Sequence, residues 1–101
     1  MKQKTYKVSV DMVKLNDDNP RYINEDKFEK LVKSIKEFPD MLEVRPLVVD
    51  ENMVVLGGNM RLQAVKHLNM PDVYVTQVNG LTEAQKREFI IKDNLGYGLW
   101  D

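Results

Sequence analysis

Residues 54–68 read VVLGGNMRLQAVKHL, and this stretch decides how the rest of the chain is interpreted. An apolar run stops at Gly57 and Gly58, and a helical pattern begins at once with Arg61 in its first turn. The apolar residues of that pattern recur at the spacing of one buried helix face: Leu62, Val65 and Leu68. The stretch therefore predicts a strand, a glycine junction and a helix over residues 59–68.

The strand before this junction has a partner immediately upstream. RPLVVD (45–50) and MVVL (53–56) flank Glu51 and Asn52, and Asn52 tolerates the positive φ that a tight turn requires. Both segments are apolar in succession rather than alternating, which is typical of strands buried on both faces. We therefore expect a hairpin inside a sheet that helices cover.

Towards the N-terminus, residues 5–13 alternate well enough for a strand, and residues 25–37 have a strong helical pattern. Asn24 is positioned to cap this helix, and Pro39 ends it. The helix has one buried face, made by Phe28, Leu31, Val32 and Ile35.

Towards the C-terminus, DVYVTQV (72–78) reads as another strand, after Asn69 and Pro71 have ended the central helix. Thr82 and Gln85 form a capping-box pattern that opens a third helix, which runs to about Asp93. Its expected core contacts are Phe89 and Ile90. The order β-α-β-β-α-β-α predicts a small α+β (mixed α/β) domain with a mixed sheet covered by helices.

Composition sets bounds on the class of protein. The chain has 101 residues, of which 43% are hydrophobic and 31% charged, so we expect one domain over residues 1–101. Trp100 beside the chain end would normally pack against something. We therefore expect this chain to be a fragment of a longer protein, or a partner to cover this end.

Several chemistries are excluded or disfavoured. The absence of cysteine rules out disulfides, thiolate metal sites and a cysteine nucleophile, and a single histidine argues against a histidine metal site. A net charge of −1 lacks the strong positive excess of a dedicated nucleic-acid binder. No apolar run approaches the roughly 20 residues of a membrane span, and the N-terminus has no apolar signal core. We expect a cytoplasmic protein without a membrane partner.

The junction itself has the features of an anion-binding site. The first amides of a helix lack intrahelical partners, and the helix dipole favours a negative charge there. Gly57 and Gly58 would let a phosphate approach the backbone, and Arg61 could add a bidentate charged contact. The alternatives are a tight glycine turn without a ligand, and a salt bridge from Arg61 to Asp93 or Glu88.

The sequence around the junction resembles the central segment of the ParB and sulfiredoxin superfamily. Residues 46–68 contain the hairpin and helix start of that segment. Residues 58–64 (GNMRLQA) lie where ParB-like domains have a GERRxRA motif, and residues 57–61 (GGNMR) lie where sulfiredoxins have GGCHR.

Two flanking motifs extend the resemblance. Residues 19–21 (NPR) precede a helix containing LVKSIKEF (31–38), as in ParB-like domains, and residues 92–95 (KDNL) resemble their ENxxR motif. The resemblance covers about residues 8–98 and implies a ParB/sulfiredoxin-like fold. The variant GGNMR with a KDN tail resembles phage and mobile-element proteins, in which a ParB-like domain often precedes a DNA methyltransferase or another DNA-acting module.

The resemblance implies a pocket for a nucleoside triphosphate, because ParB proteins bind CTP with magnesium and sulfiredoxins bind ATP. Carried over, the nucleotide and phosphate site would comprise Gly57, Gly58, Asn59, Arg61, Arg21 and Pro46, and the magnesium site Asp93 and Asn94. Residues 46–49 would line the base or sugar side. Asn59 has a simpler interpretation as the helix cap, with or without a ligand.

Departures from the family motifs limit what is carried over. Asn59 replaces both the glutamate of GERR and the cysteine of GGCHR, which excludes sulfiredoxin chemistry. Met60 and Gln63 replace arginines, and Tyr97 stands where ENxxR has its arginine. Asp93 is a shorter carboxylate than the family's glutamate. The loss of positive charge predicts weaker triphosphate binding.

Three function classes follow. The first is a DNA-associated module that binds a nucleotide, reaches DNA through an adjoining domain, and regulates or recruits a DNA-acting partner, with a homodimer possible. The second is an enzyme, an NTPase or nuclease, which would require clustered carboxylates; the scattered candidates include Asp93, Glu43 and Asp50. The third is a scaffold that keeps the fold and binds protein or DNA without nucleotide.

Overall fold

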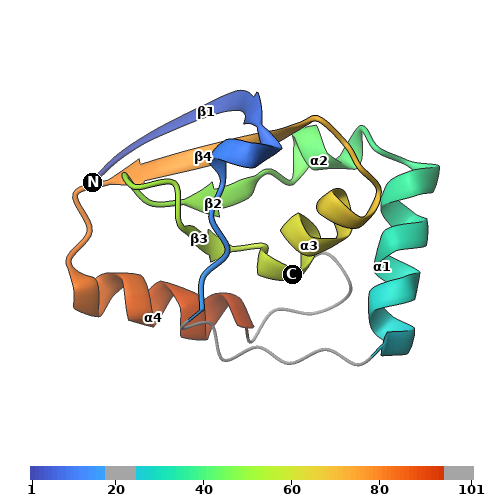
Figure 1. Ribbon diagram of the computed structural model, residues 1–101. Coiled ribbons are helices and arrows are strands. Elements are labelled where there is room, and N and C mark those ends of the chain that lie inside the picture. The colour runs from blue at the N-terminus through green and yellow to red at the C-terminus, as the bar shows by residue number, and fades with distance from the viewer. Residues whose placement is uncertain (18–24, 95–101) are drawn as a thin grey trace.

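The computed structural model describes residues 1–17 and 25–94, which form one sheet with helices packed against it (Figure 1). The elements are β1 (Lys2–Ser9), the 3-10 turn η1 (Val10–Met12), α1 (Glu25–Glu37), α2 (Met41–Val44), β2 (Leu47–Val49), β3 (Val55–Gly57), α3 (Asn59–His67), β4 (Asp72–Asn79) and α4 (Glu83–Asn94). The predicted α+β class and the order of the predicted elements are confirmed. The predicted cap Asn24 lies outside the described residues.

The sheet is mixed, as predicted, with strand order β1-β4-β2-β3. β4 pairs antiparallel with β1 and parallel with β2, whereas β2 and β3 form the antiparallel hairpin. Helix α3 therefore lies in the connection that carries the chain from the edge strand β3 back to the middle of the sheet.

One face of the sheet carries the main core. Its inward side chains are no more than 2% exposed: Leu47, Val49, Val55, Val73 and Val75. The same cluster contains side chains of α1 and α3, namely Leu31, Ile35, Leu62, Ala64 and Val65. Burial of these aliphatic groups supplies the hydrophobic stabilisation that holds α1 and α3 on this face.

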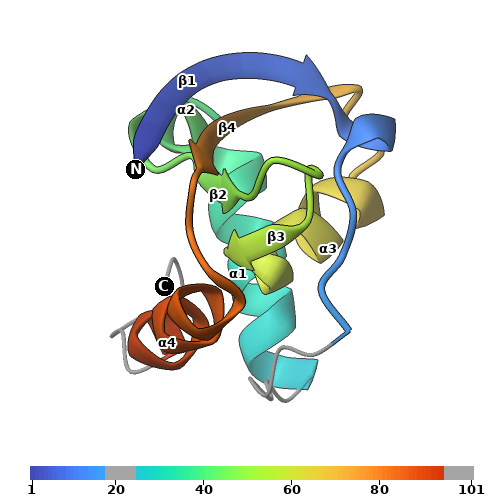
Figure 2. The same cartoon turned by 90° about the vertical axis from the view of Figure 1, so that its left-hand side faces the viewer.

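The other face of β2 and β3 is covered by α4, which stands apart from α1 and α3 (Figure 2). Successive strand residues point to opposite faces. Val48 accordingly lines the same surface depression as Phe89, and Leu56 lines the same cavity as Ile90. The expectation of a hairpin buried between helices is confirmed for these two strands.

The predicted helix signals are present as hydrogen bonds. The amide of Thr82 donates to Gln85 Oε1 at 2.9 Å and the amide of Gln85 donates to Thr82 Oγ1 at 3.1 Å, which is a complete capping box. Asn69 follows α3 in the left-handed conformation (φ 57°), and its amide donates to the carbonyl of Lys66 at 3.0 Å. None of the helices in the described part of the chain combines the length and apolar character that a membrane crossing requires.

Two predicted boundaries are wrong. The strand predicted over residues 5–13 begins at Lys2 and ends at Ser9. Ser9 Oγ accepts the amide of Asp11 at 3.3 Å and turns the chain into η1. The four-residue helix α2 was not predicted, because one turn is too short to show a periodic pattern.

The hairpin turn also differs from the prediction. The positive φ falls on Met53 (65°), not on Asn52. Asp50 Oδ1 accepts the amides of Asn52 at 2.8 Å and Val54 at 3.0 Å, so the aspartate side chain folds the turn and displaces the left-handed residue by one position.

Gly58 and Gly80 offer a matched test of the junction. Both have positive φ, 99° and 87°, but a Cβ at Gly58 would lie 2.6 Å from Leu47 Cδ2, whereas at Gly80 the nearest atom is 3.7 Å away. Backbone strain costs about 1 kcal/mol at either site, and forced repacking adds about 2 kcal/mol at Gly58. We expect Gly58→Ala to lower the free energy of unfolding by about 3 kcal/mol and Gly80→Ala by about 1 kcal/mol in urea titrations. Equal losses would contradict this account.

Candidate functional site at the β3–α3 junction

Strand β3 ends at Gly57, and Gly58 is the N-cap of α3. The first intrahelical bond of α3 runs from the amide of Leu62 to the carbonyl of Gly58 at 2.9 Å. The three amides before it, of residues 59–61, precede the helical ladder and form the positive end of the helix dipole. The predicted helix start is therefore present, one residue earlier than a cap at Asn59 would place it.

Asn59 is not the helix cap, because Gly58 occupies that position. Asn59 Oδ1 instead accepts the amide of Asn16 at 3.0 Å, and Asn16 Nδ2 donates to the carbonyl of Val55 at 2.9 Å. These contacts tie the segment after β1 to the first residue of β3 and the first residue of α3. This fixes the chain just before residues 18–24, where the predicted Arg21 lies outside the described residues.

Arg61 is 5% exposed and lies inside the junction. Its Nη1 donates to the carbonyls of Arg45 and, at 3.3 Å, Pro46. Its Nη2 is 2.8 Å from the position that a Cβ on Gly58 would take. The guanidinium thus holds the segment that leads into β2, and a glycine is needed because the arginine passes so close to the backbone.

Asp93 reaches the same junction from α4. A Cβ on Gly57 would lie 3.1 Å from Asp93 Oδ2 and 3.2 Å from the Phe89 ring. The structure therefore brings Gly57, Gly58 and Arg61 together with Asp93, although Asp93 is distant in sequence. The side chain of Asn94 is outside the described part, as are Tyr97 and Trp100.

The predicted base-side lining, residues 46–49, is wrong in part. Leu47 and Val49 have no exposed surface and belong to the core. Pro46 is half-buried, and its carbonyl accepts Arg61. Val48 points away from the core towards α4, on the face where Phe89 and Asp93 lie beside its strand partner Gly57.

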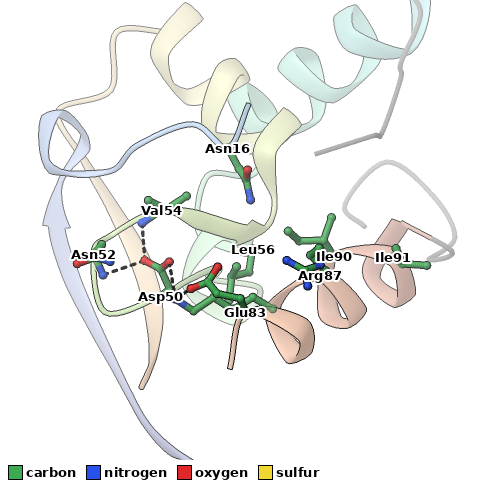
Figure 3. Close-up of a pocket in the computed structure, with 10 residues that line it drawn as sticks. Asn16, Asp50, Asn52, Val54, Leu56, Glu83, Arg87, Ile90 and Ile91 are labelled. Carbon is green, nitrogen blue, oxygen red and sulfur yellow. Dashed lines mark hydrogen bonds and ion pairs between the residues drawn. The ribbon is translucent and has the colours of Figure 1, made fainter. Parts of the chain in front are cut away.

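A cavity of about 430 Å³ lies between α4 and the β2–β3 hairpin (Figure 3). Its walls are partly aliphatic and partly polar: Asn16, Asp50, Asn52, Val54, Leu56, Glu83, Lys86, Arg87, Ile90 and Ile91. Asp50 and Glu83 lie towards one end, and Arg87 and Ile90 lie towards the other (Figure 3). Among the described residues, those predicted to bind nucleotide do not line it: Pro46, Gly57, Gly58, Asn59 and Arg61.

Lys86 forms an ion cluster that sequence reasoning missed. Its side chain is 8% exposed, and Nζ lies 2.8 Å from Glu51 Oε1, 3.2 Å from Asp50 Oδ2 and 3.4 Å from Glu83 Oε1. The hydrogen bond to Glu51 is the main cause that raises the pKa of Lys86, and it lowers the pKa of Glu51. One feature of the sequence could have predicted this burial. Lys86 stands four residues before Ile90, which places the lysine on the buried face of α4.

No group of three or more histidine, cysteine or acidic side chains in the described ranges is arranged to hold a metal ion. Asp50, Glu51 and Glu83 do converge, but on the ammonium of Lys86. Magnesium binding by Asp93 and Asn94 at the junction therefore stays a prediction.

The family follows from comparison with known proteins. The model of the ParB N-terminal domain matches residues 1–95. The chain belongs to the ParB N-terminal domain family. None of the curated proteins matches it.

Solved ParB structures share the fold of this ParB N-terminal domain. The C-terminally truncated chromosome-partitioning protein ParB from Caulobacter crescentus, complexed with CTP-gamma-S, is 20% identical with a TM-score of 0.79, and the match covers 91% of this chain and 53% of that one. The C2221 form of a Pnob8-like ParB-N domain is 23% identical with a TM-score of 0.70, covering 92% and 36%. The chain thus spans from about a third to a half of these solved chains.

The Lys86 cluster predicts a pH-dependent stability. Removing one partner of a buried ion pair costs about 3 kcal/mol or more, so Lys86→Met should be destabilised by that amount near neutral pH. Because the pKa of Glu51 is lowered from 4.5, this difference should shrink as pH falls below about 4.5. Because the pKa of Lys86 is raised from 10.5, it should also shrink as pH rises above about 10.5.

The measurement is urea unfolding of wild type and Lys86→Met between pH 3 and pH 11 (roughly the interval that spans both ordinary side-chain pKa values). A difference that stays constant across this interval would show that the cluster contributes no net charge pairing.

Proposed function

We propose that this chain is the nucleotide-binding module of a DNA-associated protein, and that its ligand is CTP held with magnesium at the β3–α3 junction. The observation that carries the proposal is the convergence of Gly57, Gly58 and Asp93 at the N-terminus of α3. Support also comes from the family and from the similarity in fold to a ParB that was crystallised with CTP-gamma-S.

The junction fits a phosphate group. A phosphate needs close access to backbone amides, and Gly57 and Gly58 put no side chain of their own in its way. The positions that their Cβ atoms would take are lined by Asp93 and Phe89 and by Leu47 and Arg61. Residues 59–61 supply the amides at the positive end of α3. The role of Arg61 is then to hold the walls of the site through the carbonyls of Arg45 and Pro46.

Magnesium is compatible with the single described carboxylate at the junction. In nucleotide sites Mg²⁺ usually keeps several waters and binds one or two carboxylates together with substrate phosphates. Asp93 would be that carboxylate, and Asn94 an additional oxygen ligand. The bound ion would neutralise charge on the phosphates.

In this proposal the nucleotide sets the state of the module, and an adjoining domain contacts DNA. Net charge of −1 gives the chain little attraction of its own for the duplex. A DNA methyltransferase or another DNA-acting module as partner, a homodimer, and a phage or mobile-element origin stay predictions.

A scaffold without nucleotide is the second candidate. It is favoured by Met60 and Gln63, which stand where the family motif has arginines, and by the inward position of the Arg61 guanidinium. The enzyme alternative, as a nuclease, has less support. The carboxylates that converge in the described part of the chain surround Lys86, whose ammonium takes the place a metal would need.

The test is thermal unfolding with magnesium and, separately, CTP, ATP, GTP and UTP. A ligand at a hundredfold excess over its dissociation constant adds about 2.7 kcal/mol, which raises the midpoint by more than about 10 °C for a domain of this size. We expect this shift with CTP. No shift with any of the four nucleotides would contradict the proposal and leave the scaffold.

Asp93→Asn should reduce the magnesium-dependent part of the CTP shift, measured against the variant's own midpoint without ligand, since it removes a charge at constant size. Glu88→Gln is the matched control, because Glu88 is on the same helix and pairs with Lys92 at 2.8 Å on the exposed side. Equal effects of the two variants would remove Asp93 from the metal site.

A further inference from the structure

Helix α4 has few buried anchors. Two of its described side chains are buried, Lys86 and Ile90, each 6% exposed. Phe89 is half-buried against Gly57, whereas Ile91 is 57% exposed. The hydrophobic contribution to docking this helix is therefore small compared with that of α1 or α3, whose anchors have no exposed surface.

The cavity beside Ile90 reduces apolar packing further. This cavity of about 430 Å³ lies between the aliphatic side chains of α4 and the hairpin, including Val54 (Figure 3). Apolar side chains on opposite walls of such a cavity make no dispersion contacts with each other. Across this gap, the described contacts that join α4 to the hairpin turn are those of Lys86.

The anchor for Lys86 is held in place by contacts that do not involve α4. Asp50 Oδ1 accepts two amides of its own turn, which leaves Oδ2 directed at Lys86 Nζ at 3.2 Å. Gln77 Nε2 donates to the carbonyls of Asp50 at 3.3 Å and Glu51 at 3.4 Å. The turn is thus fixed to the central strand β4, so it is a rigid point of attachment.

Lys86 and Asp93 are related by two helical turns. Seven residues rotate the chain by almost two full turns and advance it by about 10 Å, so the two side chains lie on the same side of α4. Lys86, at one end of this side of the helix, is held at the hairpin turn, and Asp93, at the other end, lies beside Gly57. The rotation and height of α4 at Lys86 therefore set where Asp93 lies.

We propose that Lys86 is a positioning residue for the nucleotide site: its contacts with Asp50 and Glu51 pin α4 to the β2–β3 turn and so hold Asp93 at the Gly57–Gly58 junction. The inference rests on the proposed function for its effect on nucleotide, but not for its effect on α4. Lys86 does not itself touch the ligand.

The first readout is amide hydrogen exchange, which measures local release of α4. In Lys86→Met, exchange across α4 should approach the rate of an unprotected segment while α1 keeps most of its protection, because the broken buried pair releases α4 and leaves the core contacts of α1 in place. Lys92→Met is the matched control on the same helix, since Lys92 pairs with Glu88 and is 72% exposed. Its exchange should stay at the wild-type rate.

The second readout is CTP affinity in the presence of magnesium. Lys86→Met should weaken it by roughly tenfold, Lys86→Arg should restore most of the loss, and Lys92→Met should have no effect. The double variant Lys86→Met with Asp50→Asn also removes the buried charge that the single variant would leave unpaired. Both readouts can then be measured on a folded chain.

The outcomes are distinguishable. If wild type binds no CTP, the proposed function fails, while hydrogen exchange still decides whether Lys86 pins α4. Loss of protection in α1 together with α4, in both the single and double variants, would overturn the inference, because Lys86 would then support the whole fold. Release of α4 with unchanged CTP affinity would overturn the positioning role.

Discussion

The close approach of three segments at Gly57 and Gly58 is the constraint on which the rest of this domain depends. Leu47 and the Arg61 guanidinium lie where a Cβ of Gly58 would be, and Asp93 lies next to Gly57. The sheet, α3 and α4 meet here with no room for a side chain. The absence of side chains at Gly57 and Gly58 lets the elements pack closely. In the proposed function, the same absence would let a phosphate approach the first amides of α3.

Stability and function are distributed unequally about this junction. On one face, α1 and α3 share a dry aliphatic core with the sheet, which fixes the amide end of the site. On the other face, α4 is docked mainly by Ile90 and the ion cluster of Lys86, and it carries Asp93, the carboxylate described at the junction. In the proposed function, the firmly packed half would hold the phosphate, and α4 would supply the metal ligand.

Local sequence rules recovered most of the fold. The Thr82–Gln85 capping box and Asn69 at the end of α3 act through neighbours in sequence, so they could be read directly. The junction was predicted for the same reason. Asn59 was misread because Gly58 took the cap, and the contact of Asn59 with Asn16 spans 43 residues. Lys86 was missed because a lysine is expected in solvent, and its partners Asp50 and Glu51 are brought to it only by the tertiary fold.

The most direct test of the account is an NMR titration of the ¹⁵N-labelled chain with CTP and magnesium. Amide signals report the site of contact without substituting any residue. The account predicts that the largest shifts fall on Gly58, Asn59 and Met60, followed by the end of α4 at Asp93. If the largest shifts fall instead on Asn52 and Val54 at the cavity beside the hairpin turn, or if no amide shifts, the junction is not the nucleotide site.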